Sequence, residues 1–415
     1  MREQRDRDAT GETIGERGGN GVTIKEKQHA DWIEKGLAEI AGREEELVAL
    51  ITRITEVPAP SHEEGERGRL IASIMKEFGF PEVQTDPVGN VLGFFPGRDP
   101  SRVIVSMAHM DTVFPADTPL KVRREGNILA APGVSDNSTS VAQMLLIGRI
   151  FSRNLPLPHP VVLIANVGEE GLGDLKGSRY FCAHVKEYDF GGFRLEPSRL
   201  VFLNVDGGLG QLVNAGIGSR RLKVTYRGEG GHSWGAFGNS SAIHGLGTAI
   251  AAIAKIKVPE NPRTTYNVGV ISGGISVNSI AATAEMLIDM RSVSDQALAQ
   301  VEKDVRAAID SAAAETRTTY EVEVVGDRPT GMLPPDSPLV RGLIELGKEH
   351  GIELHPSASS TDSNIPLAMG WPSVTMGFKK SENGHKVTEY LYIDSLVPGT
   401  KFALYCYEAL LFDRF

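Results

Sequence analysis

Three apolar runs that each end in acidic or histidine residues constrain the fold of this chain more than any other feature. The runs are VIVSMAHMD, VVLIANVGEE and LVFLNVD, at residues 103–111, 161–170 and 200–206. A helical stretch, SVAQMLLIGRIF at residues 140–151, separates the first two. Strands that are nearly continuous in Val, Ile and Leu, alternating with helices, are typical of a mostly parallel sheet with helices on both faces. We therefore predict an α/β fold.

The carboxyl ends of these predicted strands carry groups that bind cations. In open parallel sheets, ligands bind in the crevice beyond the carboxyl ends of the strands. One histidine and five carboxylates are expected there: His109, Asp111, Asp136, Glu169, Glu170 and Asp206. So many carboxylates would repel one another without a cation. Imidazole with carboxylates suits zinc, cobalt or manganese, and more than four candidate ligands allow two metals. The spacing alone leaves a metal site and a coincidental cluster about equally probable.

Composition excludes several classes of protein. The net charge is −10, so the long-range field repels nucleic acid, and no stretch of 18 apolar residues could form a membrane span. The two cysteines, Cys182 and Cys406, are too few for a disulfide scaffold, which favours the cytoplasm. Residues 1–24 are glycine-rich with charges of alternating sign and lack the apolar core of a signal peptide. We expect them to form a disordered tail.

Six short segments, in order along the chain, resemble the successive motifs of a known enzyme family. They are SMAHMDTVF, GVSDNSTS, NVGEEGLGD, VDGG, GHSWGAFGN and ENGHKVTE. Together they are similar to the zinc exopeptidases and amidohydrolases that include peptidase T, carboxypeptidase G, succinyl-diaminopimelate desuccinylase and the aminoacylases. The resemblance extends from about residue 40 to the end of the chain, and within the family the sequence most resembles a peptidase T-like member.

The resemblance implies a role for each matching residue. Five would bind two zinc ions: His109 and Asp206 on one, Glu170 and His385 on the other, and Asp136 bridging both. Three would be catalytic: Glu169 as the general base, Asp111 as the partner that orients His109, and His232 as the donor to the oxyanion. Asn278 and Arg291 would bind the substrate's carbonyl or carboxylate. Taken alone, a His-x-Asp pair such as His109 and Asp111 is more often a satisfied surface pair, and a Glu-Glu pair is more often a solvated helix face. The ordinary alternative for Asn278 and Arg291 is a hydrogen bond at the end of a strand.

The middle of the chain has a different pattern, in which strand, helix, strand, strand, helix and strand follow one another. This is the order of a ferredoxin-like α+β unit. We therefore expect three parts: the tail, a metal-binding catalytic domain at residues 25–215 and 327–415, and an inserted lid at residues 216–326. The resemblance implies that the lid also joins two subunits into a homodimer, so that His232 reaches the partner's active site.

These observations predict a metal-dependent hydrolase that cleaves an amide bond of a short peptide, as a peptidase T-like aminopeptidase does. An N-acyl-amino-acid amidohydrolase or a carboxypeptidase of the same family is the alternative enzyme. The non-enzymatic alternative is a catalytically inactive relative that binds ligands. The presence of every catalytic residue argues against it. No nucleic-acid or membrane partner is expected. The sequence leaves the substrate's side chains undetermined, because a metal centre recognises the scissile amide alone.

Overall fold

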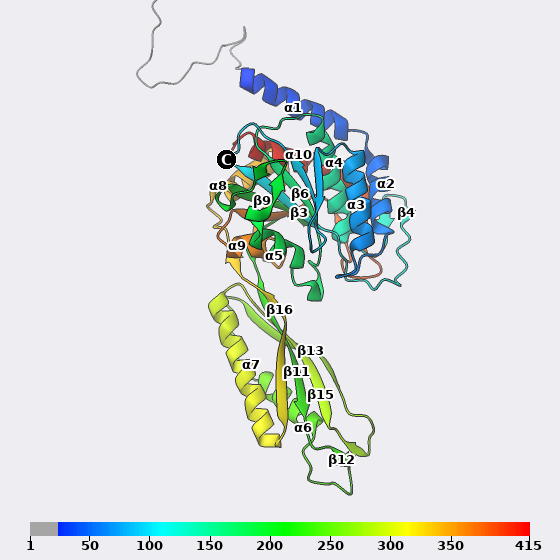
Figure 1. Cartoon of the computed structure of the whole chain (residues 1–415), viewed down its shortest axis with the longest axis vertical. Coiled ribbons are helices and arrows are strands. Elements are labelled where there is room, and N and C mark those ends of the chain that lie inside the picture. Colours follow the sequence, from blue (N-terminus) through cyan, green and yellow to red (C-terminus); the bar gives the residue numbers. More distant parts are fainter. Residues whose placement is uncertain (1–23) are drawn as a thin grey trace, which may run out of the picture.

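The structure, a computed structural model, describes residues 24–415. The tail predicted for residues 1–24 therefore lies outside the described residues, apart from Ile24, where the first helix begins. Figure 1 shows a large α/β lobe and, projecting from it, an elongated lobe built on β11, β13, β15 and β16. No helix within residues 24–415 combines the length and the apolar character that a bilayer crossing requires.

A nine-stranded sheet forms the centre of the large lobe, in the order β1-β2-β6-β3-β9-β19-β10-β17, with β18 also paired to β10. The pairs β3–β6, β3–β9, β9–β19 and β10–β18 are parallel. The pairs β1–β2, β2–β6, β10–β19 and β10–β17 are antiparallel. The strands are β1 (Glu82–Thr85), β2 (Val91–Phe95), β3 (Val103–His109), β6 (Val161–Asn166), β9 (Leu200–Leu209), β10 (Gln211–Gly216), β17 (Gly331–Met332), β18 (His355–Ser359) and β19 (Ser373–Gly377). The predicted mostly parallel α/β sheet is confirmed.

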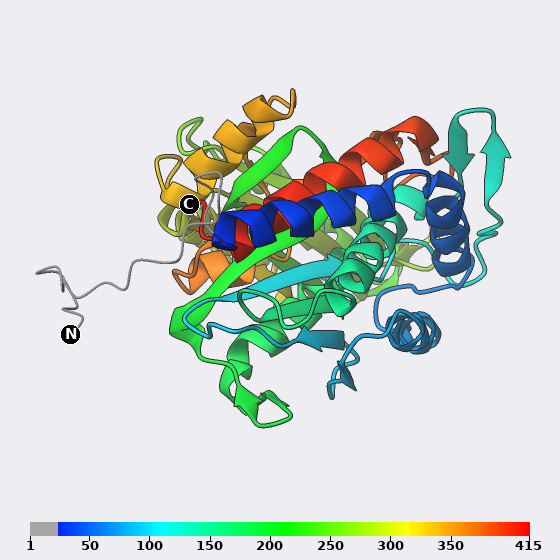
Figure 2. The same cartoon turned by 90° about the horizontal axis from the view of Figure 1, so that it is seen from above.

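Helices cover both faces of this sheet, as the apolar strands predict. Strand β3 shows why, because Ile104 and Ala108 join the hydrophobic core on one face while Val105 and Met107 join the core on the other. The helices of this lobe are α1 (Ile24–Ile40), α2 (Glu44–Thr55), α3 (Gly65–Glu77), α4 (Ser140–Ser152), α5 (Lys176–Ala183), α8 (Pro338–Glu349), α9 (Asn364–Ala368) and α10 (Leu396–Leu411). Figure 2 shows α1 lying along α10, so the start and the end of the described chain meet on one face.

Short strands complete the large lobe. A four-stranded sheet, in the order β20-β21-β5-β4, joins the segment before α4 to the segment before α10. Its strands are β4 (Arg123–Glu125), β5 (Ile128–Ala130), β20 (Ser381–Glu382) and β21 (Tyr390–Tyr392), and a separate hairpin consists of β7 (Asp189–Phe190) and β8 (Phe193–Arg194). The pairing of β21 with β5 therefore brings a late segment of the chain beside an early one.

The elongated lobe, which we call the lid, has its own core between one sheet and two helices. Its sheet is antiparallel in the order β13-β15-β11-β16. The elements are β11 (Gly218–Arg227), β12 (Gly231–His232), α6 (Ala242–Ile253), β13 (Thr264–Gly273), β14 (Ser279–Ile280), β15 (Thr283–Ser292), α7 (Asp295–Thr316) and β16 (Thr319–Arg328). Ser294 caps α7 by accepting a hydrogen bond from the Ala297 N–H, and Leu298, Val301 and Val305 then face the sheet at helical spacing.

Close approach of α10 to the central sheet generates a prediction about stability. A Cβ atom added to Gly399 would lie 1.7 Å from the carbonyl oxygen of Phe378, the residue that follows β19. Because backbone atoms cannot move aside as a side chain can, we expect Gly399→Ala to lower the free energy of unfolding by about 1–3 kcal/mol or more. The measurement is urea-induced unfolding of the full chain.

Gly247→Ala in α6 is the matched control, because no atom lies within 4 Å of a Cβ placed there. Alanine favours a helix over glycine, so this variant should be neutral or more stable by up to about 1 kcal/mol. Equal stability of Gly399→Ala and the unmodified protein would contradict the tight contact between α10 and Phe378.

Candidate metal centre

The residues predicted to bind metal lie at the carboxyl edge of the central sheet. His109 is the last residue of β3 and is paired in register with Asn166, the last residue of β6. Glu169 and Glu170 follow β6 after a turn, so their carboxylates reach the same edge. Asp136 lies in the irregular segment that precedes α4, and His385 lies in the loop between β20 and β21. Segments far apart in sequence therefore converge here.

Four of the predicted ligands are within contact distance of one another. Donor atoms of His109, Asp136 and Glu170 all lie within 4.8 Å of each other. One oxygen of Asp136 is 3.1 Å from His109 Nε2, and its other oxygen is 3.1 Å from His385 Nε2. His385 Nε2 is also 2.8 Å from Glu170 Oε1. Asp136 thus lies between the two histidines, the arrangement that a bridging carboxylate requires.

The fifth predicted ligand, Asp206, faces the same cleft without touching the other four. Its Oδ1 accepts a hydrogen bond of 2.6 Å from the backbone N–H of Gly207. It lines a cavity of about 430 Å³ together with Asp136, Glu170 and His385. Burial and the nearby charge of Asp136 raise the pKa of Asp206. The site therefore concentrates negative charge that needs a positive partner.

The donor set fits a transition-metal ion. Hydrogen bonds to Asp136 and Glu170 raise the pKa of His385 to about 11, so a proton on this imidazole supplies positive charge between the two carboxylates. A divalent cation can take the place of such a proton, since metal ligands bind in their deprotonated forms. Two imidazoles with carboxylates suit zinc, cobalt or manganese better than magnesium or calcium. The donor types do not distinguish among the first three metals.

Asp111 holds together the two strand ends that carry the site. Its fully buried carboxylate accepts hydrogen bonds from the backbone N–H groups of Glu169 and Glu170, both at 2.9 Å, and from Ser61 Oγ at 2.7 Å. His109 Nδ1 lies 3.5 Å from its Oδ1 and 3.1 Å from its backbone oxygen. Asp111 therefore contacts the ring of His109, as predicted, and also orients the Glu169–Glu170 turn.

Glu389, which the sequence analysis did not single out, positions Asp136. This fully buried carboxylate accepts hydrogen bonds from the backbone N–H groups of Gly133 (3.0 Å), Ser135 (2.7 Å) and Asp136 (2.8 Å), and from Ser135 Oγ (2.8 Å). Glu389 follows His385 by four residues within the motif ENGHKVTE. A second acidic residue at the end of that motif was the available signal.

Arg328, also missed from the sequence, contacts the predicted general base. Arg328 Nη1 lies 3.2 Å from Glu169 Oε1 and donates to Ser360 Oγ at 3.0 Å, while Nη2 donates to the backbone oxygen of Glu169. Burial raises the pKa of Glu169 well above its usual value, against the opposing charge of Arg328. A buried carboxylate with a raised pKa is a candidate proton carrier.

The three residues predicted in the lid divide between its two ends. Arg291 is near the end of β15 and lines the metal cleft with Arg221 and Arg328. His232 in β12 and Asn278 line a different cavity, of about 630 Å³. Figure 1 shows β12 at the tip of the lid, at the opposite end from β3 and β9. The structure therefore brings Arg291 to the predicted metal ligands but leaves His232 and Asn278 remote from them.

The chain is similar in sequence to a peptidase family and to several bacterial proteins. The profile described as Peptidase family M20/M25/M40 matches residues 105–409. The uncharacterized protein YqjE of Bacillus subtilis is 23% identical over 373 residues, covering 85% of this chain and 95% of that protein. The acetylornithine deacetylase of Edwardsiella ictaluri is 24% identical over 382 residues, covering 85% and 94%. The match to the profile covers His109, the predicted acidic ligands and His385.

Solved structures share the fold over nearly their whole length. The aminopeptidase PepT of Bacillus cereus has a TM-score of 0.68 at 22% identity, covering 88% of this chain and 98% of that one. A tripeptidase of Staphylococcus aureus has a TM-score of 0.72 at 19% identity, covering 89% and 98%. The YXEP protein of Bacillus subtilis, described as a dinuclear metal binding peptidase, has a TM-score of 0.63 at 17% identity, covering 89% and 98%.

The position of Glu389 generates a prediction about metal affinity. Glu389→Gln replaces an anionic acceptor of backbone N–H groups by a neutral one, so the segment that carries Asp136 should lose its orientation. We expect zinc affinity to fall about 10- to 100-fold, as is typical when a partner of a metal ligand is changed. The measurement is competition for zinc against a chromophoric chelator, with elemental analysis to count the ions bound per chain.

Glu382→Gln is the control for this experiment. Glu382 is an exposed acid in β20 of the same short sheet, where it accepts a hydrogen bond from Tyr392 and does not contact the segment at residues 133–136. Its zinc affinity should equal that of the unmodified protein. Unchanged affinity in Glu389→Gln as well would show that Asp136 does not depend on Glu389.

Proposed function

The chain belongs to peptidase family M20/M25/M40, and from that membership we propose that it hydrolyses an amide bond of a short peptide as a peptidase T-like aminopeptidase. We propose two zinc ions as its cofactor, with cobalt or manganese as possible substitutes. The ligands in this proposal are His109, Asp136, Glu170, Asp206 and His385.

One observation carries the proposal. His109 and His385 approach opposite oxygens of Asp136, each at 3.1 Å, inside a cleft that also contains Glu169. Ligands for metal and a buried carboxylate with a raised pKa therefore share one concave site. Such a combination is what amide hydrolysis by an activated water needs. A ligand-binding role without catalysis would not require the buried base.

Each residue of the cleft has a distinct part in the proposed reaction. Zinc held by His109, Asp136, Glu170, Asp206 and His385 would supply Lewis acidity toward the scissile carbonyl and the attacking water. Glu169 accepts the proton of this water at a carboxylate oxygen and then transfers it to the leaving amine. Arg328 holds the Glu169 side chain at the wall of the cleft. Asp111 keeps the Glu169–Glu170 turn and the ring of His109 in place.

Arginines on the lid side of the cleft support a substrate with a free carboxylate. Arg221 and Arg291 lie on the paired strands β11 and β15, and Asp289 holds both guanidinium groups, at 3.0 Å and 2.7 Å. Arginine binds a carboxylate through two parallel hydrogen bonds. Short peptides satisfy this requirement, and so do N-acyl amino acids, which are the alternative substrates. The similarity to an acetylornithine deacetylase also favours that alternative.

The remote position of His232 supports a homodimer joined through the lid. At the tip of the lid, His232 is exposed and surrounded by exposed apolar side chains, among them Trp234 (89%), Phe237 (90%) and Ile275 (95%). Monomeric proteins rarely expose such a group of large apolar residues without a partner. In this proposal a second copy covers them, and His232 of one subunit donates a hydrogen bond to the oxyanion in the other subunit's cleft.

A substrate screen with a base variant tests the proposed activity. The zinc-loaded protein is assayed by mass spectrometry against dipeptides, tripeptides and N-acyl amino acids, and we expect release of the amino-terminal residue from tripeptides. Glu169→Gln should retain its metal but lower kcat by about 10²- to 10⁴-fold, because it conserves shape and removes the proton carrier. Glu187→Gln, an exposed acid of the same lobe, is the control and should leave kcat unchanged.

The outcomes separate the candidates. Cleavage of N-acyl amino acids alone would replace the aminopeptidase by an amidohydrolase. Turnover by Glu169→Gln equal to that of the control would rule out Glu169 as the base.

Subunit complementation tests the role of His232. His232→Ala should depress kcat by about 10²- to 10³-fold with its metal content unchanged, since it removes a donor to the oxyanion. Mixing it with Glu169→Gln should restore part of the activity, because a heterodimer contains one site with both Glu169 and His232 intact. The control replaces His232→Ala in the mixture by His244→Ala, an exposed histidine of α6 whose own activity should be normal.

Full activity of His232→Ala would refute the role of this histidine. Absence of rescue, with subunit exchange verified by mass spectrometry, would mean that each His232 acts in its own chain or that no catalytic dimer forms.

A further inference from the structure

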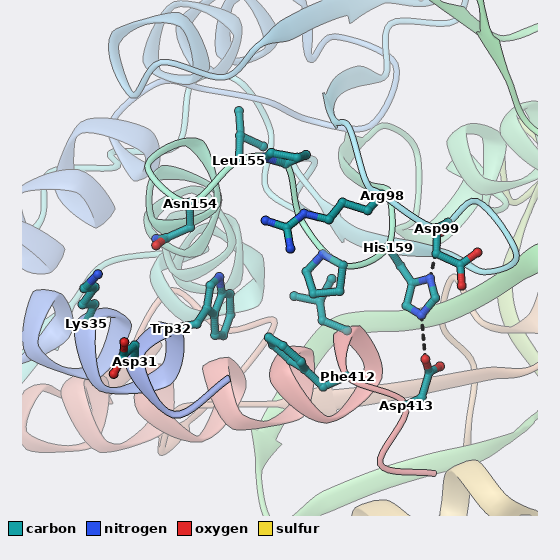
Figure 3. Close-up of a pocket in the computed structure, with 13 residues that line it drawn as sticks. Asp31, Trp32, Lys35, Arg98, Asp99, Asn154, Leu155, His159, Phe412 and Asp413 are labelled. Atoms are coloured by element: carbon teal, nitrogen blue, oxygen red, sulfur yellow. Dashed lines mark hydrogen bonds and ion pairs between the residues drawn. The ribbon is translucent and has the colours of Figure 1, made fainter. Parts of the chain in front are cut away.

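A second cavity lies at the opposite edge of the central sheet from the metal centre. It has a volume of about 580 Å³, and its walls come from α1, the turn at residues 98–99, the turn at residues 154–159 and the end of the chain at residues 411–413 (Figure 3). These two turns precede β3 and β6, whereas the metal ligands follow the same strands. The cavity is therefore separate from the proposed catalytic cleft.

Two acidic groups of this cavity, Asp413 and Asp99, already have partners within the protein. Asp413 lies 2.9 Å from Arg102 Nη1 and 2.9 Å from His159 Nε2. Asp99 accepts a hydrogen bond from the Ser101 N–H at 2.8 Å. At the rim, Asp31 and Lys35 lie one helical turn apart on α1 and carry opposite charges. Asp413 therefore has a cationic partner in Arg102.

Two donors of the cavity, by contrast, lack an acceptor in the described part of the chain. Trp32 is only 7% exposed, and its indole N–H has no hydrogen-bond partner among residues 24–415. The guanidinium group of Arg98 forms no ion pair with any described residue. Figure 3 shows the ring nitrogen of Trp32 turned toward the space between Asn154 and Arg98, with the Arg98 side chain extended into that space.

A buried N–H without an acceptor is costly, and such groups in folded proteins are nearly always satisfied. An oxygen acceptor between Trp32 and Arg98 would satisfy the indole and neutralise the guanidinium together. A carboxylate does both, because arginine offers it two parallel N–H groups. Leu155 and Phe412 line the cavity on either side of this space in Figure 3, so the rest of the ligand meets apolar surface.

From these contacts we propose that the cavity binds a small carboxylate with an apolar body. Its carboxylate accepts hydrogen bonds from Arg98 and the Trp32 indole, and its hydrocarbon part packs against Leu155 and Phe412. Since Trp32 belongs to α1 and the other walls belong to the body of the lobe, the ligand bridges α1 to the sheet.

Calorimetric titration of the full chain with 3-phenylpropanoate tests this proposal. The neutral 3-phenylpropanamide has the same apolar body without the charge, and we expect it to bind at least about tenfold more weakly. Arg98→Gln and Trp32→Phe should each raise the Kd for 3-phenylpropanoate about tenfold or more. Trp32→Phe keeps an aromatic ring beside Phe151 and Phe412, so it removes mainly the N–H.

The matched control is Arg69→Gln, which changes an exposed arginine that lines a different cavity beside α3. Its Kd for 3-phenylpropanoate should equal that of the unmodified protein. Arg98 lies in an exposed turn, so Arg98→Gln should fold normally even where Trp32→Phe does not. No binding at millimolar 3-phenylpropanoate, equal binding of the amide, or binding unaffected by Arg98→Gln would each overturn the proposal. Binding of the carboxylate at the metal centre alone would give that last result.

Discussion

The arrangement of the proposed catalytic cleft depends on the hydrogen bonds that the carboxylate of Asp111 accepts. It accepts hydrogen bonds from the backbone of both Glu169 and Glu170 and from Ser61, and it contacts His109. The ends of β3 and β6 are thus joined through one buried anion. Without it, two buried N–H groups would lack acceptors, and the turn that carries Glu169 and Glu170 would lose the hydrogen bonds that orient it.

A second buried carboxylate does the same for the other half of the cleft. Glu389 gathers the N–H groups of the segment at residues 133–136, so that Asp136 faces both His109 and His385. Because Glu389 and His385 both come from the segment between β20 and α10, the returning part of the chain provides His385 and positions Asp136. The cleft is therefore complete only after the chain has passed through the lid and returned.

The junction with the lid links the lid's orientation to the proposed base. Arg328 is the last residue of β16 and touches Glu169, while Arg221 of β11 donates to the backbone oxygen of Gly171 in the same turn. The lid and the large lobe are therefore joined at the turn that carries Glu169. At the other end of the lid, β12 lies at the tip, away from β3 and β9 (Figure 1). The lid therefore reaches the cleft through the end that carries Arg221 and Arg328.

Some features of this protein follow from short runs of residues, whereas others depend on contacts between residues far apart in the sequence. The α/β fold could be predicted because apolar strands such as β3 are buried on two faces, and this requirement is visible in a short run of residues. The grouping of His109, Asp136, Glu170 and His385 could be predicted from motifs because each ligand sits directly beside a strand or a turn with a recognisable pattern. Periodicity likewise indicated the order of elements in the lid.

Only the tertiary structure decided which distant residues position that group. Ser61, Glu389 and Arg328 act through side chains that meet their partners across 50, 253 and 159 residues of sequence, and no local pattern encodes such pairs. The same holds for the separation of Arg291 from His232, which share one inserted lobe but face opposite ends of it. Local sequence thus determined the elements and the chemistry at their ends, because burial and turn formation are short-range requirements. The tertiary structure determined which residues contact these charged groups, because a buried charge can pair only with side chains that the folded chain places beside it.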